Sequence, residues 1–177
     1  MDWRLVLTLI AFAIYFMYNA IALCRFGAPK SLSDTYYLFQ DVNKNLKWCF
    51  PVMMISMAML LMPAWIDLSE GHTLQFLSFF AAVGIILVGM IPNFKQDRTS
   101  RLGHSISAIA AALFAILWVC LVANMWYVAL VWGVLILAIM FLSGTWKISY
   151  IFWLETIAFT CTYTSIISYY LVNYYRV

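Results

Sequence analysis

Charged residues are scarce in this chain. Asp, Glu, Lys and Arg together make up 10% of its 177 residues, while 66% are hydrophobic, whereas charged residues account for about 25% of a typical soluble domain. The shortage excludes an ordinary soluble core. The net charge of +3 does not indicate nucleic-acid binding either, because the cations lie at the ends of apolar segments, where they contact lipid headgroups.

Long polar connections are also missing. The longest segment between two apolar runs extends from Cys24 to Lys47, which leaves no room for a separate extramembrane domain. We therefore expect residues 1–177 to form a single integral membrane bundle.

Metal-binding and nucleophile signatures are absent as well. The four cysteines show no paired spacing of the kind that holds a metal, and no motif names a reaction; they are Cys24, Cys49, Cys120 and Cys161. The sequence predicts neither a metal nor a cofactor.

What the chain does contain is six apolar runs, and a run of about 20 residues crosses a bilayer core of about 30 Å as a helix. The runs cover residues 5–23, 48–66, 74–91, 104–125, 127–142 and 148–170. Each is continuous, whereas a barrel strand alternates apolar and polar residues. The fold class predicted is all-α, a polytopic transmembrane bundle of six spans. The first run should stay as a helix rather than act as a cleaved signal, because Arg25 and Lys30 follow it and would oppose export.

The basic residues predict the orientation. Eight of the ten fall on one side of a six-span topology: Arg25, Lys30, Lys44, Lys47, Lys95, Arg98, Arg101 and Lys147. Only Arg4 and Arg176 fall on the other side, with both termini. By the positive-inside rule, the first set faces the cytoplasm and both termini lie outside a bacterial inner membrane.

Two features predict how the helices pack. Short links force antiparallel hairpins, so the second run should lie beside the third and the fourth beside the fifth. Small residues recur every four positions in the fourth run and allow another helix to approach closely; they are Gly103, Ser107, Ala111 and Ala115.

The first cytoplasmic connection carries Ser31, Ser33 and Asp34. In one interpretation Ser31 and Asp34 form a capping box for a short helix, whose aromatic residues Tyr36, Tyr37 and Phe39 lie on the membrane surface. In the other, the connection folds back over the mouth of the bundle and presents hydroxyls and a carboxylate to a ligand. The sequence leaves both open.

Four further polar groups fall in the same cytoplasmic half. His104 opens the fourth run and shares a helix face with Ser107. Glu155 lies inside the sixth run, where an unpaired carboxylate is costly, so it should face the bundle interior and find a partner. Asn19, at a comparable depth in the first run, is the partner that the sequence suggests.

The Ser-Leu-Ser-Asp element, the 88–92 segment Val-Gly-Met-Ile-Pro and His104 with its following small residues resemble poorly characterised six-helix bacterial membrane proteins related to the DRAM and Sfk group. A more distant similarity to alkaline ceramidases and adiponectin receptors would imply Ser, Asp and His around zinc. The chain departs from that pattern because it lacks a seventh span and the His-x-x-x-His pair of the last helix.

Three functional hypotheses follow. The leading one is a small bacterial or phage-encoded multipass protein of the cytoplasmic membrane that binds a lipid or a membrane-protein partner without chemistry of its own, using Asn19, Ser107 and Glu155. The second is a metal-dependent, lipid-directed hydrolase in which Asp34 and His104 activate water and Ser31 or Ser33 supports them. The third is proton-coupled transport through Glu155, although no run is broken at its middle as transporter sites often require.

Overall fold

The computed structural model describes residues 2–146 and 149–175, and for residues 143–146 and 173–175 we describe the backbone alone. Seven α-helices and one short 3-10 helix, η1 (Leu46–Trp48), account for most of this part of the chain, which contains no strand. The helices are α1 (Trp3–Phe26), α2 (Thr35–Val42), α3 (Cys49–Asp67), α4 (Phe76–Met90), α5 (Arg98–Leu121), α6 (Trp126–Trp146) and α7 (Tyr150–Tyr175). The all-α prediction is confirmed.

Four stretches of helix are long and apolar enough to cross a membrane: Trp3–Phe26, Leu46–Asp67, Arg98–Leu121 and Tyr150–Val172. Two further apolar helices are shorter, Phe76–Met90 and Trp126–Leu142. The structure thus supports a transmembrane helical bundle.

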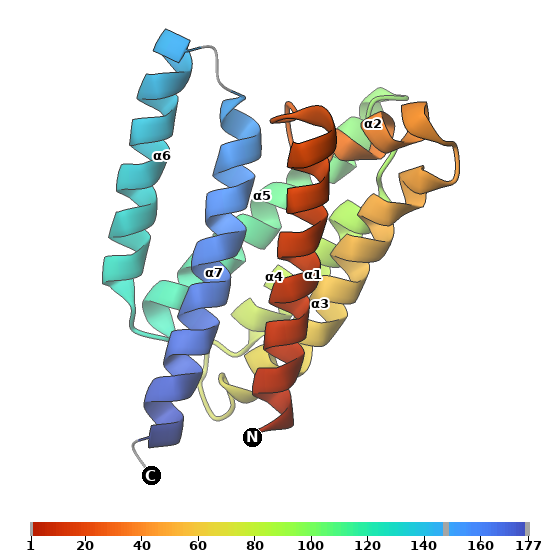
Figure 1. The fold of residues 1–177 in the computed structure, drawn as a ribbon. Coiled ribbons are helices and arrows are strands. Elements are labelled where there is room, and N and C mark those ends of the chain that lie inside the picture. Colours follow the sequence, from red (N-terminus) through yellow and green to blue (C-terminus); the bar gives the residue numbers. More distant parts are fainter. Residues whose placement is uncertain (1, 147–148, 176–177) are drawn as a thin grey trace.

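The four long helices and the two shorter apolar ones run alternately in opposite directions, so that the start of α1 and the end of α7 lie at one end of the bundle and α2 lies at the other (Figure 1). Helix α3 packs against α1 and α4, and α4 packs against α5. The predicted hairpin of the second and third runs is confirmed as α3 and α4.

Helix α6 departs from the second predicted pairing. It contacts α7 more extensively than it contacts α5. Asn124, in the link between α5 and α6, has a φ of 53°, a left-handed conformation that Asn tolerates better than most residues. The chain turns there, and α6 diverges from the oblique α5 to stand beside α7 (Figure 1).

The small residues of α5 mark its close contact with α4. Ser107, Ala111 and Ala115 are buried, and a Cβ added to Gly84 of α4 would lie 2.9 Å from Ala111, backbone atoms included. The close helix approach predicted from the small residues is confirmed at Ala111.

A hydrogen-bonded cluster closes the bundle at the end where the termini lie. The Trp118 indole N–H donates to Ser69 Oγ at 2.7 Å, and that hydroxyl donates to the Trp65 carbonyl at 2.7 Å. The two indole rings meet edge to face, with centroids 5.8 Å apart. Nearby, Arg4 of α1 pairs with Asp67 at the end of α3, at 2.7 Å.

Candidate functional site

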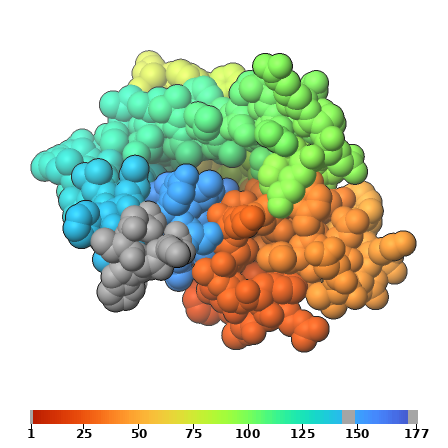
Figure 2. Space-filling model, turned by 90° about the horizontal axis from the view of Figure 1, so that it is seen from above, coloured from red at the N-terminus to blue at the C-terminus, as the bar shows by residue number. Residues whose placement is uncertain are grey.

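The first connection folds back into the opposite end of the bundle. Leu32, Ser33, Asp34 and Thr35 are all buried. Seen from this end, the connection and α2, in orange, meet the green segment between α4 and α5 and adjoin the blue α7 (Figure 2). The structure agrees with the second interpretation in that the connection folds back over the mouth of the bundle; its presentation of polar groups to a ligand stays a prediction.

The surface-helix interpretation is correct only in part. A short helix, α2, does form, but its Tyr36 and Phe39 are buried in the protein instead of lying on the membrane surface. Ser31 Oγ accepts the Asp34 backbone N–H at 3.1 Å, which is one half of the predicted capping box, while the Asp34 side chain makes no capping bond. The aromatic side chains find apolar contacts inside the bundle, such as that between Phe39 and Tyr18 of α1, with ring centroids 5.7 Å apart.

Ser33 and His104 form a hydrogen-bonded pair. The Ser33 Oγ lies 2.8 Å from His104 Nε2, and His104 Nδ1 lies 2.8 Å from the Ile91 carbonyl oxygen. Because a carbonyl only accepts, Nδ1 carries the proton, and in the neutral ring Nε2 then accepts from the serine hydroxyl. Both side chains are buried.

Local sequence explains why that carbonyl is free to accept. Helix α4 ends at Met90 and Ile91 is its C-terminal cap, since Pro92 follows and disfavours helical geometry for the residue before it. In a continued helix the backbone N–H of Lys95 would bond to the Ile91 carbonyl, but here it donates to the Tyr37 hydroxyl at 2.8 Å. Phe94 stacks on the His104 ring at a centroid distance of 4.6 Å and an angle of 21°, which fixes the imidazole plane.

The start of α5 is fixed by its own cap. Asp97 Oδ1 accepts the Ser100 backbone N–H at 2.7 Å, and its other oxygen accepts the Ser100 hydroxyl at 2.8 Å. These two bonds hold the pKa of the Asp97 carboxyl below its usual range. His104 follows within the next two turns, so this cap sets its height in the bundle.

Asp34 does not join the serine–histidine pair. Its carboxylate binds the Lys95 ammonium at 2.5 Å, and that ammonium also lies 4.6 Å from the centre of the Tyr37 ring. The contact ties the first connection to the segment between α4 and α5. Lys95 is half-exposed, so this ion pair forms the outer edge of the site.

Glu155 finds a partner other than the one expected. Its Oε2 accepts the backbone N–H of Leu32 at 2.5 Å, whereas Asn19 donates its amide to the Tyr15 carbonyl of its own helix at 2.9 Å. The predicted pairing of Asn19 with Glu155 is wrong, because the returning connection brings a backbone donor to the carboxylate first. Helix α7 runs unbroken past Glu155.

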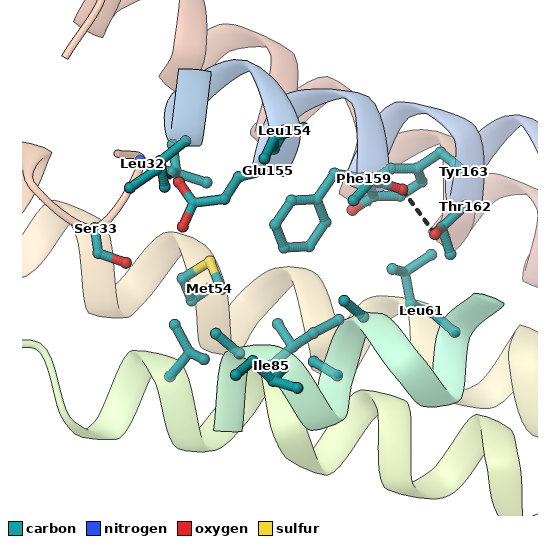
Figure 3. Close-up of a pocket in the computed structure, with 18 of the residues that line it drawn as sticks. Leu32, Ser33, Met54, Leu61, Ile85, Leu154, Glu155, Phe159, Thr162 and Tyr163 are labelled. Carbon is teal, nitrogen blue, oxygen red and sulfur yellow. Dashed lines mark hydrogen bonds between the residues drawn. The ribbon is translucent and has the colours of Figure 1, made fainter. Parts of the chain in front are cut away.

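Next to these groups lies a cavity of about 380 Å³. Its walls come from the first connection and from helices α3 to α7, and they are almost entirely apolar. Ser33 and Glu155 lie together at one end, while Thr162 and Tyr163 lie toward the other (Figure 3). Trp65 of the closing cluster is also among the lining residues.

Ser107 and Asn19 are not among the described residues that line this cavity. The Ser107 hydroxyl donates to the Gly103 carbonyl within α5, at 2.8 Å. Ser31 is outside the lining as well. Of the predicted site residues, the structure therefore brings Ser33, His104 and Glu155 to the cavity end, with Asp34 at its edge.

Sequence reasoning missed the cavity walls. Trp132, Phe159 and Ile109 line the cavity, but an apolar side chain facing a hollow and one facing lipid have the same sequence signal. It also missed Phe94 and Lys95 as partners of the site, because both lie in a connection whose path the sequence does not fix.

A zinc site of the kind that the distant resemblance implies does not fit these residues. Among the described residues, no three His, Cys, Asp or Glu side chains lie close enough to hold a metal ion. Both ring nitrogens of His104 are engaged, by Ser33 and by the Ile91 carbonyl. We therefore derive no step through a metal.

Comparison of the chain with protein-family models, with curated proteins and with solved structures gave no match.

Proposed function

We propose that this protein is a multipass protein of a bacterial cytoplasmic membrane, encoded by the bacterium or by a phage. It binds an acyl-chain lipid inside its helical bundle. The observation that carries the proposal is the cavity of about 380 Å³ with apolar walls and two polar side chains, Ser33 and Glu155, at one end. Ligand sites in proteins have volumes of about 300 to 1,000 Å³ and are mostly apolar with a few placed polar groups. An acyl chain with a polar head matches this distribution.

We infer that the cavity opens toward the bilayer. Two of its lining residues are well exposed, Ile109 of α5 at 67% and Ile151 of α7 at 43%. An acyl chain can therefore pass from the bilayer between α5 and α7 without crossing water. Such lateral access favours a membrane lipid over a water-soluble ligand.

We test lipid binding with a phosphatidylglycerol whose acyl chain carries a photoactivatable diazirine, mixed into vesicles that hold the protein. We expect crosslinks at cavity residues that face away from the bilayer, such as Phe159 and Trp132, the latter only 3% exposed. Ala158, which lines the cavity in α7, is changed to Phe to fill it, and crosslinking there should fall several-fold.

The matched control is Ala13→Phe, the same change at an exposed position of α1 outside the cavity lining, and it should leave crosslinking unchanged. Crosslinks confined to outward-facing residues such as Val134 and Leu137, which are 66% and 67% exposed, would contradict lipid binding in the cavity.

The proposal includes six spans with both termini outside. Helix α4 has 15 residues and is about 22 Å long, shorter than a bilayer core of about 30 Å. It packs between α3 and α5 and its direction alternates with theirs (Figure 1), which supports a short crossing. Of the basic residues that carry the orientation, Lys147 and Arg176 lie outside the described residues.

Labelling of single cysteines tests this topology, in a background without the native cysteines. Cysteines placed at Lys30 and Arg98 should be protected from an impermeant thiol reagent in intact cells and react only after permeabilisation. A cysteine at Glu70, an exposed residue after α3, should react in intact cells. Labelling at position 30 in intact cells would overturn the orientation.

A further inference from the structure

We propose that Ser33 is a nucleophile and His104 its general base, and that together they hydrolyse a fatty acyl ester bound in the cavity. The inference rests on the proposed lipid binding and adds chemistry to it. It differs from the metal-dependent hydrolase that the sequence suggested, because the residue that reacts is the serine and the histidine acts on its proton.

The arrangement of the pair carries the argument. A serine hydroxyl becomes a useful nucleophile when a base lies within hydrogen-bond reach and a third group orients that base. Here the base is 2.8 Å from the hydroxyl, and the Ile91 carbonyl holds the other ring nitrogen at the same distance. Phe94 stacks on the ring, so the imidazole has one orientation, with Nε2 directed at Ser33.

The position of the pair relative to the cavity supports the same role. Ser33 lines the cavity and His104 is not among its lining residues, so Ser33 lies between His104 and the cavity. In an ester lipid the carbonyl joins the apolar chain to the polar head. A chain that occupies the apolar part of the cavity would bring this carbonyl to the polar end, where Ser33 lies (Figure 3).

Glu155 is a positioning residue in this scheme. Its bond to the Leu32 backbone N–H anchors the residue directly before Ser33 to α7. On the other side of Ser33, the pairing of Asp34 with Lys95 anchors the next residue to the segment before α5. Ser33 is thus held in place through both of its neighbours in the chain.

The reaction balances without an oxidant or reductant. The Ser33 oxygen bonds to the ester carbonyl carbon while its proton passes to His104 Nε2. The bond from that carbon to the alcohol oxygen breaks, and the alcohol leaves with the proton. Water then gives a proton to Nε2, its oxygen bonds to the acyl carbon, and the bond to Ser33 breaks as Ser33 recovers a proton. The products are an alcohol, such as a lysolipid, and a fatty acid.

A purely structural role would also satisfy two buried polar groups, and reactivity separates the two roles. The probe is a long-chain alkyl fluorophosphonate added to the full-length protein in phosphatidylglycerol and phosphatidylethanolamine vesicles. We expect covalent labelling of the unmodified protein, with the adduct located at Ser33 by mass spectrometry. Because this result needs no variant, it does not depend on whether a variant folds.

Variants then assign the roles. Ser33→Ala should abolish labelling, and His104→Gln, which keeps a hydrogen-bonding side chain but cannot take the proton, should slow it by about 100-fold or more. Ser165→Ala removes a buried hydroxyl of α7 outside the cavity lining and should label like the parent. Release of fatty acid from phosphatidylglycerol should follow the same order.

Two results would overturn the inference: an unlabelled Ser33 in the unmodified protein, or labelling of Ser33→Ala equal to that of the parent. Diazirine crosslinking in the cavity, measured on the same preparation, reports lipid binding independently. If cavity crosslinks form and Ser33 stays unlabelled, the lipid-binding function stands and the hydrolytic one fails. If neither occurs, both fail.

Discussion

Helix α5 meets two neighbours in opposite ways. Toward α4 it packs extensively, and Gly84 approaches the Ala111 backbone so closely that no Cβ fits between them. Toward α7 its contacts are fewer, and Ala108 and Ala112 border the cavity there. Small residues therefore permit close packing only where the facing helix lies near and also carries a small residue. Elsewhere they leave an unfilled cavity.

The difference has an energetic consequence in a membrane. Between helices in lipid, association depends on dispersion contacts rather than on the hydrophobic effect. Helices α4 and α5 make these dispersion contacts with each other. The hollow beside α7 forfeits them unless another apolar group fills it, so a bound acyl chain would complete the packing that the chain leaves unfinished.

Gly84→Ala should disrupt the close contact between α4 and α5. The added Cβ would lie 2.9 Å from Ala111 atoms, and the backbone atoms among them cannot rotate away. We expect the two helices to move apart at a cost toward the upper end of the usual range for overpacking, about 1 to 3 kcal/mol. Unfolding in detergent, followed by circular dichroism, measures the loss.

The control is Gly103→Ala in α5. There the nearest atom to the new Cβ is Ile91 Cδ1 at 3.3 Å, the end of a flexible side chain that can move by a few tenths of an ångström. Its effect should be small, and the helix propensity of Ala relative to Gly adds about 0.8 to 1 kcal/mol of stabilisation to both variants. Equal stability of the two variants would mean that the α4–α5 approach is not close.

The sequence predicted the helices and the close packing because both depend on local patterns. Continuous apolar runs identify spans, and residues four apart share a helix face, so Ser107, Ala111 and Ala115 could be expected to pack together. Ser33 and His104 could be proposed as site residues because both fall in the cytoplasmic half of the predicted topology. That they bond to each other was not predictable, since the connection that carries Ser33 could have lain on the membrane surface.

The parts that sequence reasoning missed depend on how helices are placed in three dimensions. The cavity exists because α7 makes few contacts with α5. The apolar sequence of α7 would be the same if the two helices packed directly against each other. The expected pairing of Asn19 with Glu155 failed for a related reason. The positions of Asn19 and Glu155 along their helices predict that the two residues lie at the same depth. They do not predict that the first connection places a backbone donor, the Leu32 N–H, against Glu155.

Substitutions of Glu155 test the cavity side of the comparison, because this residue holds the first connection against α7 at the end of the cavity. In Glu155→Leu the Leu32 backbone N–H would lose its acceptor, at an expected cost of about 1 to 3 kcal/mol in unfolding free energy. In Glu155→Gln the carboxamide oxygen can still accept that N–H, so the change should stay below about 1 kcal/mol. Crosslinking of the diazirine lipid should weaken in the leucine variant, where Ser33 loses one anchor, and persist in the glutamine variant. Glu70→Leu, the same substitution at an exposed position, should leave both measurements unchanged. A Glu155→Leu protein that is as stable as the parent and binds lipid equally well would show that this carboxylate does not hold the connection in place.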